Sequence, residues 1–263
     1  MLAYHNIVPA DVSVDGDRSL HLRADLFAEQ LRIVQSEASL VSLEDLLKAS
    51  STTRDKLVAV TFDDAYRSAL LLGLPLCAAE GVGATVFVAP GILGAVPAWD
   101  EAAGQGAWSD EERSRFLWTE RGRRPVDTGA TGTEYLRVGT EEQLRQALKV
   151  GIHRVANHTF WHPNLGALPA AEVAEEVERA NDWLLARFPA FLLPYLAYPY
   201  GIPPRDISAL AELPSVEYAF IVSGGRMGER SLSNRFQLPR WNVPAGISRD
   251  GFRLRLRGWL VGR

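Results

Sequence analysis

The stretch Val58-Ala59-Val60-Thr61-Phe62-Asp63-Asp64 joins an apolar, β-branched run to two adjacent carboxylates. Such a run predicts a buried strand that delivers the acids to the edge of a sheet. Adjacent side chains at a strand end point to different sides, so one carboxylate can bind a metal while the other accepts a proton. The alternative is that the aspartates cap a helix, because residues 65–71 continue with a plausible helical pattern.

Composition excludes several classes of protein. The chain has 263 residues, of which 47% are hydrophobic and 23% charged, which suffices for one domain of barrel size. The net charge of −4 argues against nucleic-acid binding, which requires a concentrated basic face. The single cysteine, Cys77, allows no disulfide within one chain. No transmembrane segment or signal peptide is visible, so we expect a cytoplasmic protein.

Short apolar runs alternate with helical patterns along the chain, which predicts parallel strands joined by crossovers. The predicted strands are Leu2–His5, Leu57–Phe62, Ala84–Val88, His153–Asn157, Tyr195–Tyr198, Tyr218–Val222 and Phe236–Leu238. We expect helices over 25–35, from Ser42 as N-cap, and over 170–188. The last helix carries four glutamates on what we interpret as its solvated face, Glu172, Glu175, Glu176 and Glu178. Seven strands favour a closed or nearly closed α/β barrel over 1–263, with an open doubly wound sheet as the alternative.

Residues 90–139 break this alternation. They contain Trp99, Trp108, Trp118 and Tyr135 among many Gly, Pro, Asp and Arg residues, over a length too great for an ordinary loop. We interpret the segment as an insertion over one barrel face that shapes substrate choice rather than the fold. A partly disordered excursion is the alternative, against which the aromatic residues argue.

Two histidines lie in a second polar cluster. His158 and His162 are four residues apart, which on a helical turn places both imidazoles on one face at a spacing that suits a first-row metal. Two ordinary histidines are the alternative. In a barrel, the carboxyl ends of the strands form one face, so the acids after one strand would meet the histidines after another. His5, Tyr198–Gly201 and Arg240–Asn242 also follow strand ends.

The stretches Thr61–Asp64, His158–His162 and Tyr198–Gly201, in that order, resemble the motifs of the polysaccharide deacetylase family, the NodB-homology carbohydrate esterases. The opening Tyr4-His5 is similar to the branch that deacetylates poly-N-acetylglucosamine. The resemblance implies a distorted (β/α) barrel with about seven strands. It also implies a metal-dependent hydrolase that removes N-acetyl groups from an amino sugar or an N-acetylglucosamine-containing glycan, so the expected partner is an acetylated amino sugar.

The resemblance also implies roles for individual residues. Asp64, His158 and His162 would bind one divalent metal ion, usually zinc, with Co²⁺ or Ni²⁺ as alternatives. Asp63 would be the general base, and a backbone N–H near Tyr200 would help to hold the oxyanion. The residues expected to contact substrate are His5, Tyr198, Tyr200 and Trp241.

Two departures from the family pattern leave alternatives open. The third motif often begins with an arginine that steadies the catalytic aspartate, but that position is Ala197 here. Arg240 could substitute from the last strand, or it could be a surface residue. Many members also supply a late histidine as general acid, whereas all 5 histidines lie at or before His162. Two alternatives remain for the general acid: Asp63 could return its proton to the leaving amine, or a metal-bound water could donate one. The alternatives are an inactive sugar-binding pseudoenzyme and an amide or imide hydrolase of the same fold, and the intact Asp63 and metal-binding pattern argue against them.

The C-terminal residues 252–260 alternate apolar and basic side chains. We favour a closing helix or strand packed on the barrel. Contact with a membrane surface is the alternative.

Overall fold

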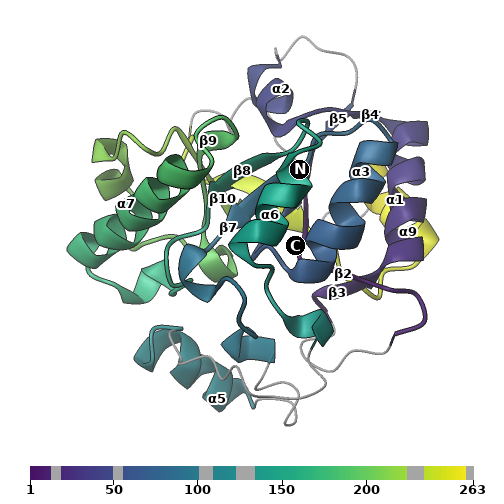
Figure 1. Cartoon of the computed structure of the whole chain (residues 1–263). Helices are drawn as coiled ribbons and strands as arrows, with labels where there is room; N and C mark the ends of the chain where they lie inside the picture. The colour runs from purple at the N-terminus through teal and green to yellow at the C-terminus, as the bar shows by residue number, and fades with distance from the viewer. Residues whose placement is uncertain (13–18, 50–55, 101–108, 123–133, 224–233, 259–263) are drawn as a thin grey trace.

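The computed structural model describes residues 1–12, 19–49, 56–100, 109–122, 134–223 and 234–258. Parallel strands close into a barrel in the order β1-β11-β10-β9-β8-β7-β6 (Figure 1). The barrel strands are β1 (Leu2–Tyr4), β6 (Val60–Phe62), β7 (Thr85–Val88), β8 (Arg154–Asn157), β9 (Leu192–Ala197), β10 (Tyr218–Val222) and β11 (Leu238–Asn242). The predicted (β/α) barrel with about seven parallel strands is confirmed, and an open sheet is excluded because β1 pairs with both β6 and β11.

Helices and short strands surround this barrel. The α-helices are α1 (Ala24–Glu37), α2 (Leu43–Lys48), α3 (Leu74–Ala79), α5 (Asp110–Ser114), α6 (Glu141–Leu148), α7 (Ala170–Arg187) and α9 (Arg249–Arg257). Shorter helical turns are η1 (Ala69–Gly73), η2 (Pro90–Ile92), η3 (Arg115–Thr119), η4 (Glu134–Leu136), η5 (Leu165–Ala167), η6 (Pro199–Gly201) and η7 (Ser208–Glu212). Two small parallel sheets pair β2 (Asn6–Val8) with β3 (His21–Arg23), and β4 (Ser39–Leu40) with β5 (Leu57–Val58). The predicted N-cap of α2 is confirmed, because the Ser42 side chain accepts a hydrogen bond from the Asp45 N–H.

The last barrel strand lies further along the chain than predicted. Residues 236–238 carry the apolar signal, but β11 continues to Asn242 through Pro239 and Arg240. Proline has no N–H for a sheet ladder and a charged side chain is rarely buried, so both residues disguise a central strand. The strand forms because β1 and β10 pair with it on either side.

Phenylalanine and small residues fill the interior of the barrel. The rings of Phe87 on β7 and Phe220 on β10 meet across it, with centroids 5.6 Å apart. Buried alanines on or directly beside other strands leave room for these two rings, namely Ala59, Ala156 and Ala197. The guanidinium of Arg240 lies 4.9 Å from the centroid of the Phe87 ring. This aromatic layer therefore supports a buried arginine inside the barrel.

The ends of the 90–139 segment are integrated with the barrel. Val96 and Val138 are buried, the Val138 N–H donates to the Ala95 carbonyl at 2.8 Å, and Gly139 N–H donates to the Ala65 carbonyl at 2.8 Å. Between these ends, α5 and η3 lie at the lower edge of the view in Figure 1. Trp108 lies outside the described residues.

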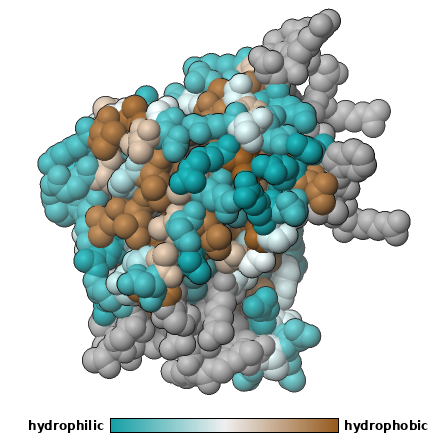
Figure 2. Space-filling model, turned by 90° about the vertical axis from the view of Figure 1, so that its right-hand side faces the viewer, coloured by the Kyte–Doolittle hydropathy of each residue, from teal (hydrophilic) through white to brown (hydrophobic). Residues whose placement is uncertain are grey.

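The C-terminal stretch forms a helix as far as it is described. Helix α9 packs beside α1, with Phe252 fully buried and Arg257 donating to the Glu37 carboxylate (Figure 1). Figure 2 shows this side of the molecule, where hydrophilic and hydrophobic residues are interspersed. Trp259 and Leu260 lie outside the described residues. Among those described, no helix combines the length and apolar character needed to cross a bilayer.

His153, beside β8, makes the stability of the fold depend on pH. Burial lowers the pKa of this imidazole from 6.5 to about 4, and its Nδ1 accepts a hydrogen bond from the Ala84 N–H at 3.2 Å. As the pH falls, the unfolded state therefore binds the proton first. We expect the free energy of unfolding to decrease by up to about 3 kcal/mol between pH 6.5 and pH 4 on this account.

The variant His153→Asn keeps a hydrogen-bond acceptor but does not titrate. Its stability should therefore lack this part of the pH dependence, while all other groups contribute equally in both proteins. Urea denaturation of both proteins between pH 7 and pH 4 measures the difference. If the free energy of unfolding showed the same pH dependence in both proteins, the expectation would be contradicted.

Candidate functional site

The loops that follow β6 and β8 bring three predicted metal ligands together. One carboxylate oxygen of Asp64 lies 3.1 Å from Nε2 of His162 and 3.4 Å from Nε2 of His158. The three ligand atoms lie within 4.8 Å of one another, and all three residues are buried. The structure thus places an Asp-His-His cluster at the carboxyl-terminal rim of the barrel, where the sequence predicted it.

The chemistry of this cluster fits a divalent metal ion. Within the described residues, Oδ1 of Asp64 is buried without a hydrogen-bond donor, which is costly unless another partner satisfies it. Burial opposes ionisation of Asp64, but the imidazoles of His162 and His158 outweigh burial and lower the pKa of the carboxyl. For His162, burial dominates and lowers the pKa of the ring, whereas for His158 burial is outweighed by the carboxylates of Asp64 and Asp63, which raise the pKa of the ring. An ionised carboxylate and a neutral imidazole are the forms that bind metals, and this donor set suits zinc.

The two histidines are not on a helical turn, so that part of the prediction is wrong. After β8 the chain runs as an irregular loop, with Thr159 at φ 64° and His162 at φ 57°, both in the left-handed region. The imidazoles nevertheless meet, with ring centroids 4.8 Å apart. Contacts from outside the loop must therefore supply the support that a helix would have given.

Glu176 on α7 supplies much of this support. Its Oε2 accepts hydrogen bonds from the backbone N–H groups of Phe160 at 3.1 Å and Trp161 at 2.8 Å. Glu176 is buried, so its interpretation as a solvated residue is wrong. The helical period contains a signal for this role, because Glu176 lies on the same face as the buried Val173 and Val177.

Asp63 forms an ion pair with Arg240 in the barrel interior. Nη1 of Arg240 donates to Oδ1 of Asp63 at 2.6 Å, and Nη2 donates to Oδ2 at 2.8 Å. Arg240 is fully buried, which excludes the alternative of a surface residue. Burial opposes ionisation of Asp63, but Arg240 outweighs burial and lowers the pKa of the carboxyl. Asp63 is therefore a fixed carboxylate.

Neither aspartate caps a helix. The Asp63 oxygens accept from Arg240, and the Asp64 oxygen faces the two histidines. Asp64 and Ala65 have φ of 66° and 56°, so the chain passes through left-handed conformations before the next helical turn begins. The structure thus separates the two carboxylates into two environments.

His5, which was expected only to contact substrate, lies beside the predicted general base Asp63. Its Nε2 lies 4.0 Å from Oδ2 of Asp63, and its side chain is 13% exposed. Many family members place the general acid on a late histidine, whereas His5 lies near the start of the chain. Because β1 pairs with β6 in the closed barrel, the residue after β1 reaches the same rim as Asp63. Its position directly after the first strand was the available signal.

Tyr200 lies at the cluster. Its ring centroid is 4.7 Å from that of His162, and its hydroxyl donates to the Gly122 carbonyl at 3.3 Å. Tyr200 has φ 60°, so η6 turns sharply here. Together with Trp99, whose ring is 4.4 Å from that of His162, it forms an aromatic wall beside the histidine.

Tyr198 and Trp241, which were expected to contact substrate, lie away from the cluster. The Tyr198 side chain is fully buried and donates to the Phe236 carbonyl at 2.8 Å. Trp241 stacks on Phe252 of α9, with centroids 5.4 Å apart. Side chains alternate along a strand, so Trp241 points outward because its neighbour Arg240 faces inward.

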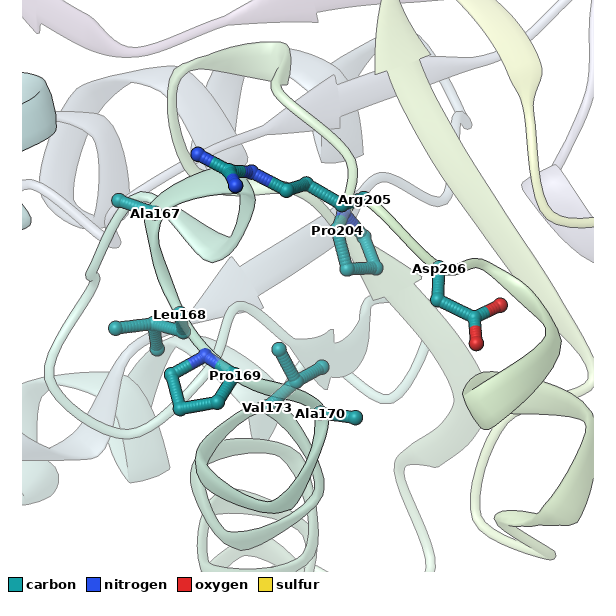
Figure 3. Close-up of a pocket in the computed structure, with 8 residues that line it drawn as sticks. All are labelled: Ala167, Leu168, Pro169, Ala170, Val173, Pro204, Arg205 and Asp206. Carbon is teal, nitrogen blue, oxygen red and sulfur yellow. The ribbon is translucent and has the colours of Figure 1, made fainter.

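A separate pocket lies between η5, the start of α7 and the segment after η6 (Figure 3). Its volume is about 360 Å³. It is lined by Ala167, Leu168, Pro169, Ala170, Val173, Pro204, Arg205 and Asp206. None of the predicted site residues lines it, so the pocket is distinct from the metal-ligand cluster.

A double-mutant cycle tests the Asp63–Arg240 pair. Asp63→Asn and Arg240→Met each leave one buried charge unpaired, which costs about 3–5 kcal/mol, whereas the double variant leaves none. We expect a coupling free energy of at least about 2 kcal/mol from urea denaturation. The exposed pair Glu37–Arg257 is the control, and its coupling should be much smaller because solvent screens it. Equal coupling in both pairs would contradict the assigned burial.

Several known proteins are similar to this chain in sequence or in fold. A chitooligosaccharide deacetylase from Bradyrhizobium is 37% identical over 81 residues, which cover 30% of this chain and 36% of that relative. The structure of the deacetylase PplD from Streptococcus pyogenes, in complex with acetate, superposes with a TM-score of 0.67 at 19% identity and covers 97% of this chain and 96% of that chain. IcaB from Ammonifex degensii superposes with a TM-score of 0.62 at 17% identity and covers 97% of this chain and 94% of that chain.

These structural likenesses establish the fold, and the sequence model of a family goes further. The model described as polysaccharide deacetylase matches residues 50–219, which is more than half of the chain. The match includes Asp63, Asp64 and both histidines of the cluster. The chain therefore belongs to the polysaccharide deacetylase family.

Proposed function

We propose that this protein is a metal-dependent hydrolase that removes N-acetyl groups from an amino sugar or an N-acetylglucosamine-containing glycan. The observation that carries the proposal is that two adjacent carboxylates lie in different environments. Asp64 faces two imidazoles with an unsatisfied oxygen, while Asp63 is held apart by Arg240. Family membership supplies the substrate class.

Asp64, His158 and His162 are the proposed ligands of one divalent ion, with zinc favoured over Co²⁺ or Ni²⁺ by the donor set. When bound, such an ion lowers the pKa of a water to about 7 and polarises an acyl oxygen. Three protein ligands leave positions free for water and substrate.

Asp63 is the proposed general base. It accepts a proton from the attacking water as the C–O bond forms at the acetyl carbon. Arg240 binds both oxygens, which fixes the direction of the carboxylate and keeps it ionised. The backbone N–H near Tyr200 remains a proposed oxyanion donor.

His5 is the proposed proton donor to the leaving amine. It lies beside Asp63 and is partly exposed, so it can reach a substrate that enters from solvent. As the C–N bond breaks, the sugar nitrogen takes a proton from His5, and acetate and the free amine result. Unlike the late histidine of many family members, this proposed donor follows the first barrel strand.

The two alternatives differ from this proposal in acetate release or in the need for a metal site. A sugar-binding pseudoenzyme would hold the acetylated sugar without releasing acetate. An amide or imide hydrolase of this fold that works without metal would not need the Asp64 cluster. The fixed Asp63 beside that cluster favours metal-dependent turnover over both.

Substitution of each aspartate should produce a different result. Asp63→Asn should leave the metal content near that of the wild type but lower turnover about 10²- to 10⁴-fold, because an amide cannot accept the proton. Asp64→Ala should lower metal affinity first. Metal analysis, melting temperature and acetate release on both variants measure these effects. An active Asp63→Asn protein would end the proposed mechanism.

The substrate class is tested by acetate release from a panel of acetylated sugars. We expect release from N-acetylglucosamine oligomers or from smaller acetylated amino sugars, and loss of release after chelation with recovery on adding Zn²⁺. The absence of bound metal after soaking with zinc, cobalt or nickel would contradict the metal site. Activity confined to cyclic imides would assign the protein to the other hydrolase class.

A further inference from the structure

The two histidines of the cluster are held in different ways. Nδ1 of His158 donates to the Ala197 carbonyl at 2.8 Å. Nδ1 of His162 is buried and, within the described residues, has no hydrogen-bond partner. A metal-binding imidazole is normally oriented by a hydrogen bond from its second nitrogen. His162 must therefore be oriented by something else.

Aromatic rings pack on His162 instead. The Trp99 ring lies 4.4 Å from the imidazole at an interplanar angle of 39°, and the Tyr200 ring lies 4.7 Å away at 74°. Trp99 and Tyr200 also meet edge to face at 5.9 Å. These contacts restrict rotation of the imidazole, which stands on a left-handed residue of an irregular loop.

A chain of buried polar groups in turn holds Trp99. The indole N–H of Trp99 donates to the Tyr66 hydroxyl at 2.9 Å, and that hydroxyl donates to Asp100. Nε2 of His21 lies 3.1 Å from the other oxygen of Asp100, and Nδ2 of Asn6 lies 3.2 Å from Nδ1 of His21. Because the Asn6 amide nitrogen only donates, Nδ1 of His21 accepts and Nε2 donates to Asp100.

We propose that Trp99, Tyr66, Asp100 and His21, the hydrogen-bonded network, are positioning residues that orient His162 for metal binding. This inference rests on the metal site proposed above. Removal of one member lets the indole move, and the imidazole then loses its contact with the Trp99 ring.

The location of this hydrogen-bonded network favours a positioning role over a purely structural one. Tyr66 follows the ligand Asp64 by two residues, and Trp99 contacts the ligand His162. The hydrogen-bonded network thus connects the loop that carries Asp64 with the side chain of His162. A phenylalanine at position 66 would fill nearly the same volume without burying polar groups that need partners, so core packing alone does not require the hydroxyl.

The variant Tyr66→Phe tests the proposal, with Tyr4→Phe as a matched control. Both tyrosines are buried and donate a hydroxyl hydrogen bond to a side-chain oxygen, but Tyr4 bonds to Gln30 in the outer core. We expect Tyr66→Phe to weaken Zn²⁺ affinity about tenfold or more in competition with a chromophoric chelator, and to change the absorption spectrum of the Co²⁺ form. Tyr4→Phe should lower stability with metal affinity and spectrum unchanged.

A second variant, Trp99→Phe, retains an aromatic ring but loses the indole N–H. Trp99 is only partly buried, so this protein should fold, as circular dichroism will verify, and it too should bind Zn²⁺ more weakly. Wild-type affinity and an unchanged Co²⁺ spectrum in both variants would overturn the inference alone. Absence of metal binding by the wild type would overturn the proposed function together with it.

Discussion

The ion pair between Arg240 and Asp63 is the interaction on which the arrangement of the site depends. It joins residues 177 apart in sequence inside a closed barrel. Burial of two charges is tolerated only where geometry and additional contacts are good. Here both guanidinium Nη atoms bond to the carboxylate, Nη1 also reaches the Thr61 hydroxyl, and Phe87 lies beneath. The pair thereby fixes one carboxylate and leaves Asp64 free to face the histidines.

Backbone strain concentrates around the same rim. Within the described residues, the non-glycine positions with positive φ are Asp64, Ala65, Arg121, Thr159, His162 and Tyr200. Such conformations cost on the order of 1–3 kcal/mol each and persist only where the surroundings enforce them. The Glu176 carboxylate and the rings beside His162 provide this enforcement for the loop after β8. The strained loops can exist because the barrel beneath them is rigid and well packed.

Sequence patterns predicted the parts of this protein that depend on local order. The alternation of strands and helices predicted the barrel, and the apolar run ending at Asp63 and Asp64 predicted one ligand of the metal site. Both predictions depend on local properties, the hydrophobic period and the strand ends. The sequence left two alternatives for Arg240 and placed His5 only at a strand end, because their contacts with Asp63 depend on barrel closure, which no local pattern encodes. The helical turn expected at His158–His162 did not form, and the backbone N–H groups of Phe160 and Trp161 instead donate tertiary hydrogen bonds to Glu176.

The position of Arg240 follows from the register of the barrel. Phe220 on β10 pairs with Ala197 on β9 and with Leu238 on β11, so the last two residues lie at one level. Arg240 is two residues beyond Leu238 and therefore faces inward again, one step closer to the rim and to Asp63. A guanidinium can reach the carboxylate from any strand on which it faces the barrel interior at the height of Asp63. More than one strand of a closed barrel offers such a position. An arginine missing from β9 is thus compatible with an intact site, and Ala197 instead gives its carbonyl to His158.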